Sequence, residues 1–178
     1  MTAPALAPDQ SRRQRGYART TLVQLGKETT VQMFSTADAV KVHVMQLDPG
    51  DYLLESLREL IATQNIRNGA VISGIGTLDE CTMHMVASAG MPPVEVFPRW
   101  DKVGLELTSM QGIIAAGVPH IHMIISMPTG AIGGHLEEGC RILYLGEVVV
   151  LEFAGLDLTR EPTEANIMKL TRRTSPPQ

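Results

Sequence analysis

The sequence predicts an α+β fold: a single compact domain with a mostly antiparallel sheet of about seven strands and one main helix. Two observations predict it. Apolar residues recur at helical spacing in one segment only, whereas the other apolar runs are short, strand-like and separated by Gly, Pro and Asn turns. The length of 178 residues suits one well-buried domain, and no period of about 20–50 residues repeats.

Each expected element has its own sequence signal. Val40–Leu47 alternates like a strand and ends at an Asp-Pro-Gly turn, and Asp51 is the expected N-cap of a helix that continues to about Gln64. Prolines indicate a loop at residues 88–100. The last strand is apolar on both faces, which indicates that a helix or a partner subunit covers it. The further strands are expected at Ala70–Leu78, at Cys81–Ala87 after a tight Asp79-Glu80 turn, and at Val103–Ser109, Ile113–Ala116, His120–Ser126 and Arg141–Phe153.

We expect three parts: a basic N-terminal arm (residues 1–28), an acidic domain (29–158) and a C-terminal tail (159–178). The charge counts, taken with bounds that differ by one residue, follow this division. Residues 1–27 hold five basic residues and one acidic residue, residues 28–159 have a net charge of −10, and residues 160–178 have a net charge of +2. An acidic body repels a phosphate backbone, whereas a basic arm attracts one by releasing counterions. Weak DNA binding is therefore expected through Arg12, Arg13, Arg15 and Arg19 of the arm, with a solvated tail as the alternative.

Composition argues against a membrane or secreted protein. No uncharged apolar stretch approaches the roughly 20 residues that a membrane span requires, and the N-terminus lacks the apolar core of a secretory signal. Two cysteines, Cys81 and Cys140, do not make a disulfide framework. We therefore expect a cytoplasmic protein in which both thiols are buried and free.

Three histidines lie close together in the segment GVPHIHMIISMPTGAIGGHLEEG, residues 117–139. His120 and His122 are two residues apart in a strand-like run, so their imidazoles share one side of the strand. A turn at residues 127–130 reverses the chain and returns His135 toward them. Three neutral imidazoles around one point bind a divalent transition metal, usually zinc, with a fourth position open. The alternative is three separate, partly exposed strand histidines.

The other histidines and motifs give weaker evidence of a functional site. His43 and His84 lack ligand-like spacing, so both are expected to be ordinary sheet residues, with the reach of His84 left open. The adjacent pair Glu137 and Glu138 either helps at a metal centre or forms a solvated turn. The chain has no complete dinucleotide fingerprint, no phosphate-binding Gly-Lys-Ser/Thr loop and no nucleophile elbow.

The histidine segment also resembles a known family. PHIHMIIS and GGHLEEG resemble the signature of the plant-and-prokaryote-conserved (PPC) domain, which occurs in plant AT-hook nuclear proteins and as free-standing bacterial proteins. Three further blocks follow the family's order: LDPGDYLLESLRELI, NGAVISGIGTLDECTMHMV and KVGLELTSMQGIIAAG. Leu105 stands where the family usually has Phe, and Glu106 occupies its acidic position. The resemblance covers approximately residues 30 to 158.

The resemblance implies a free-standing bacterial PPC protein that forms a homotrimer and has a DNA-binding or regulatory role. It also places His120, His122 and His135 where some prokaryotic relatives bind metal, which implies one zinc ion per subunit. A zinc-dependent enzyme of the hydrolase or lyase type, or a small-molecule-binding protein, is the alternative. The run SRRQRG lacks the Arg-Gly-Arg-Pro core of an AT-hook, so the DNA-contacting element of the plant proteins is missing.

Two further hypotheses concern the surroundings of the metal. Glu106, on the polar face of its strand, is the candidate for orienting a metal ligand or transferring a proton. Gly74 and Gly76 are the candidates for the wall of a ligand pocket, because a glycine strand lets a ligand or a neighbouring backbone come close.

Overall fold

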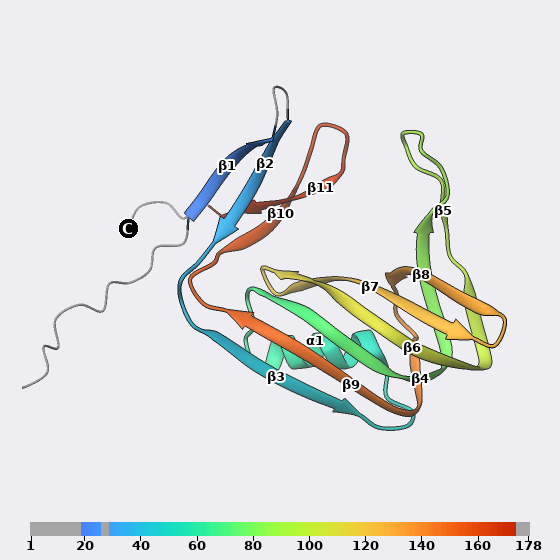
Figure 1. Cartoon of the computed structure of the whole chain (residues 1–178). Helices are drawn as coiled ribbons and strands as arrows, with labels where there is room; N and C mark the ends of the chain where they lie inside the picture. The colour runs from blue at the N-terminus through green and yellow to red at the C-terminus, as the bar shows by residue number, and fades with distance from the viewer. Residues whose placement is uncertain (1–18, 26–28, 174–178) are drawn as a thin grey trace, which may run out of the picture.

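The computed structural model describes residues 19–25 and 29–173 (Figure 1). These residues form one helix, α1 (Leu53–Thr63), and eleven strands. The strands are β1 (Arg19–Leu25), β2 (Thr29–Ser35), β3 (Val40–Leu47), β4 (Gly69–Val86), β5 (Glu95–Val96), β6 (Arg99–Ala115), β7 (Val118–Met127), β8 (Gly130–Leu136), β9 (Arg141–Phe153), β10 (Leu158–Pro162) and β11 (Met168–Arg172). The predicted α+β class, with a mostly antiparallel sheet and one helix, is confirmed.

One antiparallel sheet of seven strands makes up the body of the molecule. Its order is β3-β9-β4-β6-β7-β8, with β5 paired to β4. The sheet also curls, because β8 pairs with the far end of β4, at Met83 and His84. Two hairpins, β1–β2 and β10–β11, form small sheets of their own beyond one end of the large sheet (Figure 1).

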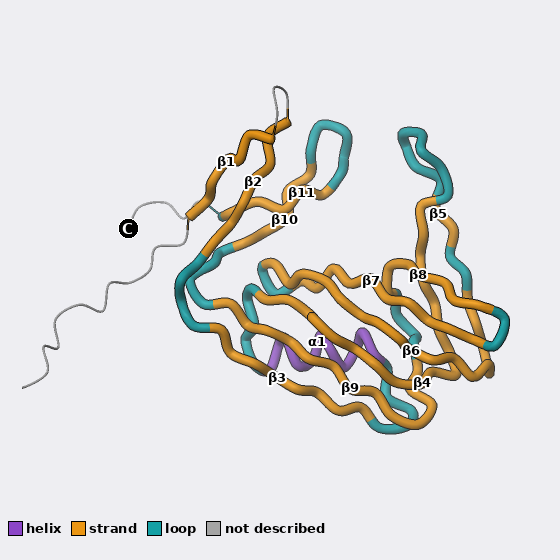
Figure 2. The backbone as a smooth tube through the Cα atoms, in the orientation of Figure 1, coloured by secondary structure: helices purple, strands orange, loops and turns teal. Residues whose placement is uncertain are grey.

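Helix α1 covers one face of the sheet (Figure 2). Its apolar stripe is buried, including Leu53, Leu57 and Ile61, and packs into the core with inward residues of the strands. The predicted N-cap was wrong by one residue: Tyr52 is the N-cap, and no side chain caps the helix. The Asp51 carboxylate instead accepts a hydrogen bond from the backbone N–H of Asp48, 2.9 Å away, and so closes the preceding turn.

Two strands are longer than the sequence indicates. β4 continues through the expected turn at Asp79 and Glu80, where the structure has only a register shift. Both carboxylates pair with Arg141 of β9 at 2.8–2.9 Å, so this acidic pair joins two neighbouring strands instead of reversing the chain. β6 likewise runs unbroken from Arg99 to Ala115, and the proline-rich segment contains the short strand β5.

Alternation along the strands gives the sheet an outer face that points away from α1. Inward residues such as Met110, Ile121 and Met123 are buried, whereas the residues between them, including His120 and His122, are exposed. The expected buried thiols are confirmed: Cys81 and Cys140 are free and fully buried, with their Sγ atoms 3.8 Å apart. No helix in residues 19–25 and 29–173 combines the length and the apolar character that a membrane crossing needs.

Candidate metal centre

Strand register places three histidines in one row on the outer face. His84 of β4 is the register partner of His135 of β8, and His135 is in turn the partner of His122 of β7. Gln111 of β6 continues the row as the partner of His122. Cross-strand partners have Cβ atoms roughly 4.5–5.5 Å apart, so these side chains are immediate neighbours. His120 lies two residues along β7 from His122, on the same face.

The three histidines expected to form the site are close together. Ring centroids lie 5.2 Å apart for His120 and His122, 5.1 Å for His120 and His135, and 5.5 Å for His122 and His135. The Nε2 atoms of His120 and His122 face each other at 3.3 Å. Two ligands of a tetrahedral zinc ion, each about 2.0–2.1 Å from the metal, are also about 3.3 Å apart.

A fourth histidine and a carboxylate complete the cluster. The ring centroid of His84 lies 4.9 Å from that of His135. One oxygen of Glu137 lies 2.9 Å from Nδ1 of His84 and 3.0 Å from Nδ1 of His135. His84, His135 and Glu137 each offer a ligand atom, and these three atoms all lie within 4.8 Å of one another. They form a possible metal-binding group.

Sequence reasoning missed His84 because the signal that brings it to the site is not local. Its alternation on a strand gives the face on which it lies, but only the pairing of β4 with β8 puts it beside His135. The backbone helps to hold this arrangement: Glu137 N–H donates to the carbonyl oxygen of Thr82 at 3.2 Å. Glu138, by contrast, pairs with Arg58 and is exposed.

The close approach of β8 to β4 depends on Gly134, the residue before His135. A Cβ atom at Gly134 would lie 2.9 Å from the carbonyl oxygen of His84 and 2.9 Å from the side chain of Met85. Any other residue would therefore push the two strands apart and separate His84 from His135. Gly134 thus explains how His135 comes close to His84.

The electrostatic environment favours neutral imidazoles. Burial, and then the nearby His135, lower the pKa of His120, and Arg160 lowers it further. Burial, His135 and His84 lower the pKa of His122. A metal ion binds the neutral form of histidine. Both rings therefore have the protonation state that a metal ligand needs at neutral pH.

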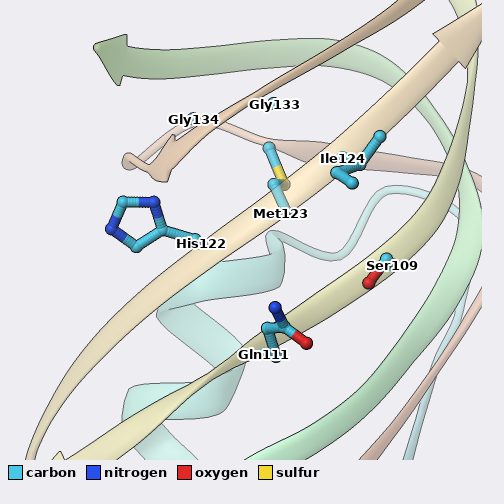
Figure 3. A pocket seen from close by; sticks show the side chains of 7 residues that line it. All are labelled: Ser109, Gln111, His122, Met123, Ile124, Gly133 and Gly134. Carbon is cyan, nitrogen blue, oxygen red and sulfur yellow. The ribbon is translucent and has the colours of Figure 1, made fainter. Parts of the chain in front are cut away.

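Hollows adjoin the cluster on the outer face. One, of about 470 Å³, is lined by His84, Met85, Val86, His120, His122, Gly133, Gly134 and His135. A second, of about 210 Å³, shares His122 and both glycines, and Figure 3 shows Gln111 and Ser109 on the strand beside His122. A ligand in these hollows would contact the imidazoles directly.

The other predicted site residues lie elsewhere. Glu106 is the register partner of Ser126, which is four residues and roughly 13 Å along β7 from His122. It lines a separate hollow of about 410 Å³ with Ser126 and Tyr144, so the carboxylate beside the histidines is Glu137 and not Glu106. His43 pairs with Glu152 on β9, 2.8 Å away, as an ordinary sheet residue.

The two candidate pocket glycines pack against protein atoms. A Cβ atom at Gly74 would meet the side chain of Met110, and one at Gly76 would meet the carbonyl oxygen of Leu145. The residues that line the hollow beside the histidines are different ones. Three of the four arginines proposed for DNA binding, at positions 12, 13 and 15, lie outside the described residues. Arg19 begins β1, and only its backbone is described.

The sequence of this domain matches the model of a known protein family. The family model of the Plants and Prokaryotes Conserved (PCC) domain matches residues 34–154, which covers β3 to β9 and every residue of the histidine cluster. The chain belongs to this family. The resemblance seen in the sequence, under the name PPC, is thereby confirmed.

Solved structures share the fold. A metal-containing protein from Archaeoglobus fulgidus is 22% identical with a TM-score of 0.61, and covers 71% of this chain and 89% of its own. A PPC protein from Pyrococcus horikoshii is 23% identical with a TM-score of 0.60, covering 76% and 94%. A protein from Bacteroides thetaiotaomicron, described as a "putative DNA binding protein", is 14% identical with a TM-score of 0.64, covering 86% and 97%. At these identities the likeness establishes the fold alone.

Curated relatives contain a similar segment within a longer chain. The bifunctional protein GlmU of a Synechococcus strain is 26% identical over 128 residues. Those residues are 71% of this chain but only 19% of that protein. The chain therefore spans about a fifth of the length of the curated relatives that it matches.

Proposed function

We propose that this PPC protein binds one zinc ion per subunit through Nε2 of His120, His122 and His135. The observation that carries the proposal is the 3.3 Å separation of the His120 and His122 Nε2 atoms, which matches two ligands of one tetrahedral ion. Glu137 would hold His135 from the other side, because its oxygen lies 3.0 Å from Nδ1 of that ring. A carboxylate on the second nitrogen of a metal-binding histidine fixes the ring and its tautomer.

A second ligand set has a specific observation in its favour. His84, His135 and Glu137 already lie within 4.8 Å of one another through their ligand atoms. In that arrangement Glu137 would bind the ion directly, and His120 and His122 would stay outside the coordination sphere. We favour the first set because Glu137 lies at hydrogen-bond distance from both Nδ1 atoms, as an orienting carboxylate does.

Metal content tests the proposal. Protein purified without a His-tag and without added metal is expected to contain about one zinc ion per subunit by elemental analysis. A chelator should remove the ion and lower the unfolding temperature, because a ligand that binds only the folded state stabilises it. Protein that stays metal-free even after exposure to excess zinc would contradict a metal centre of either kind.

The chemistry open to such a centre is hydrolytic or lyase-type and acts on a small molecule. A zinc ion with three protein ligands keeps a position for water, whose pKa falls to about 7 when it is bound. The hollow of about 470 Å³ next to the imidazoles supports this proposal, because it leaves room for a substrate beside the ion. We place this activity in the cytoplasm, which the two free cysteines support.

We also propose a homotrimer. The outer face of the sheet exposes large apolar side chains on the two strands that flank β9, including Val42 and Val44 of β3 and Ile72 and Ile75 of β4. Contiguous exposed apolar side chains mark interaction surfaces. Light scattering at micromolar concentration is expected to give three times the mass of one chain. A monomer at that concentration would contradict the proposal.

DNA binding is a second candidate function, supported by two structural neighbours whose names ascribe it to them, from Bacteroides thetaiotaomicron and Ralstonia eutropha. In this chain the basic arm would carry the affinity. We expect DNA binding that is weak, does not depend on base sequence, and loses affinity steeply as the salt concentration rises. Deleting residues 1–19 is expected to abolish it. A full-length variant with Arg12, Arg13, Arg15 and Arg19 changed to Gln should behave in the same way.

Fluorescence anisotropy with two unrelated duplexes, measured across a salt series, checks this expectation. Each phosphate contact contributes about −0.9 to the slope of log affinity against log salt. Tight and sequence-selective binding that survives the deletion would show that the folded domain reads DNA.

A further inference from the structure

Arg160 returns from the C-terminal hairpin to the edge of the histidine cluster. It lies on β10, and its guanidinium donates one hydrogen bond to the carbonyl oxygen of Val118 at 3.1 Å and another to that of Ile113 at 2.9 Å. Ile113 is the register partner of His120, and Val118 is two residues before His120 on β7. Two strand residues span about 7 Å, so the guanidinium lies within the length of a small molecule from His120.

The guanidinium of Arg160 has N–H donors that its two carbonyl bonds do not use. Arginine has five N–H donors and is always charged in proteins, and the two carbonyl bonds use only two of these donors. None of the acidic side chains in residues 32–173 forms an ion pair with it. The side chain is half-buried, and burial lowers its pKa. A fixed, partly desolvated cation that has no acidic partner among these described side chains attracts an anion strongly.

The guanidinium of Arg160 is fixed at the edge of the histidine cluster by two backbone carbonyl groups. Its carbonyl bonds hold it in place, so it cannot swing away into solvent without losing both. An ion at the imidazoles and the guanidinium of Arg160 would therefore present two fixed positive centres along one edge of the outer face.

We propose that Arg160 binds one anionic end of a small molecule whose other anionic end is held at the metal centre. The proposal rests on the metal centre proposed above. Its ligand class is a short molecule with two anionic groups: a dicarboxylate, or a molecule that carries one carboxylate and one phosphate. The guanidinium fork suits both groups, because carboxylate and phosphate each accept two parallel N–H bonds.

Succinate, phosphoglycolate and acetate are the probes, titrated calorimetrically into the zinc-loaded full-length protein. Succinate or phosphoglycolate should bind at least tenfold more tightly than acetate, which has one anionic group and can use only the metal. In Arg160→Gln this advantage should disappear, because a hydrogen bond to a charged group contributes on the order of ten- to a hundredfold in affinity. Arg160→Lys should retain part of it, since the charge remains but the fork is lost.

Lys41→Gln is the matched control, because it removes one positive charge from the opposite edge of the sheet, where Lys41 pairs with Glu152. It should bind all three probes like the parent. Zinc affinity of each variant, measured separately, should stay within about threefold of the parent value, which is well below the effect expected at Arg160.

The possible outcomes separate this proposal from the metal centre. A parent protein that binds no zinc contradicts the proposed function. In a second outcome, the parent protein binds zinc and yet binds succinate and phosphoglycolate no more tightly than Arg160→Gln does. That result would contradict the anion site and leave the metal centre standing. Loss of zinc in Arg160→Gln would also overturn it, because Arg160 would then act by positioning His120. Preference for succinate or for phosphoglycolate assigns the ligand to dicarboxylates or to phosphorylated acids.

Discussion

Replacing His135 with alanine is expected to abolish zinc binding, because both possible ligand sets contain His135. The loss should exceed the roughly 10- to 100-fold decrease in affinity that follows removal of a residue that only orients a ligand. The fold should survive, since the His135 side chain lies on the outer face of the sheet and not in the core. Zinc titration against a fluorescent competitor, with circular dichroism to confirm folding, measures both expectations.

Three companion variants decide which ligand set operates. If the ion lies between His120, His122 and His135, then His122→Ala should bind zinc as poorly as His135→Ala. His84→Ala should then bind zinc within about tenfold of the parent, as expected for loss of a neighbour that is not a ligand. The opposite pattern would assign the ion to His84, His135 and Glu137. His43→Ala, a histidine paired with Glu152 elsewhere in the same sheet, is the control and should change nothing.

Gly112→Ala should have the largest effect on the stability of the sheet under the histidines. A Cβ atom at this position would lie 2.1 Å from the carbonyl oxygen of His120 and 2.8 Å from Cα of Ile121. Both atoms are backbone, so the clash can be relieved only by moving β7 away from β6. We expect a loss of about 1–3 kcal/mol in the free energy of unfolding, as for other overpacked sites. Because β7 carries His120 and His122, zinc affinity should fall as well.

Gly104→Ala provides the matched control on the same strand. A Cβ atom at Gly104 would meet no other heavy atom within 4 Å. Its free energy of unfolding should stay within about 0.5 kcal/mol of the parent, as for other surface substitutions. Urea unfolding of both variants, followed by zinc titration, makes the comparison. Equal stability of the two variants would show that β6 and β7 are not held as close together as the structure has them.

The sequence predicted what local periodicity determines. The strands Val40–Leu47 and Arg141–Phe153 were predicted with their observed bounds, because both are bordered by clear turns. The period of two placed His120 and His122 on one face, and the turn after β7 brought His135 back beside His122.

What the sequence could not predict depends on contacts between distant segments. The pairing of β4 with β8 brings His84 to the site, and the hairpin at the C-terminal end brings Arg160 back to β6 and β7. Neither pairing leaves a spacing signal in the chain. The position of Glu106 depends on register in the same way: it lies on β6, the strand beside β7, but its register partner is Ser126 and not a histidine.

Anomalous diffraction from a crystal of the zinc-loaded protein is the most direct test of the proposed metal centre. One anomalous peak per subunit is expected on the outer face of the sheet. That peak should lie about 2.0–2.1 Å from Nε2 of His120, His122 and His135, with Glu137 bound to the far nitrogen of His135. A peak bound instead by Glu137 and His84, or imidazoles that point away from one another with no peak between them, would contradict it.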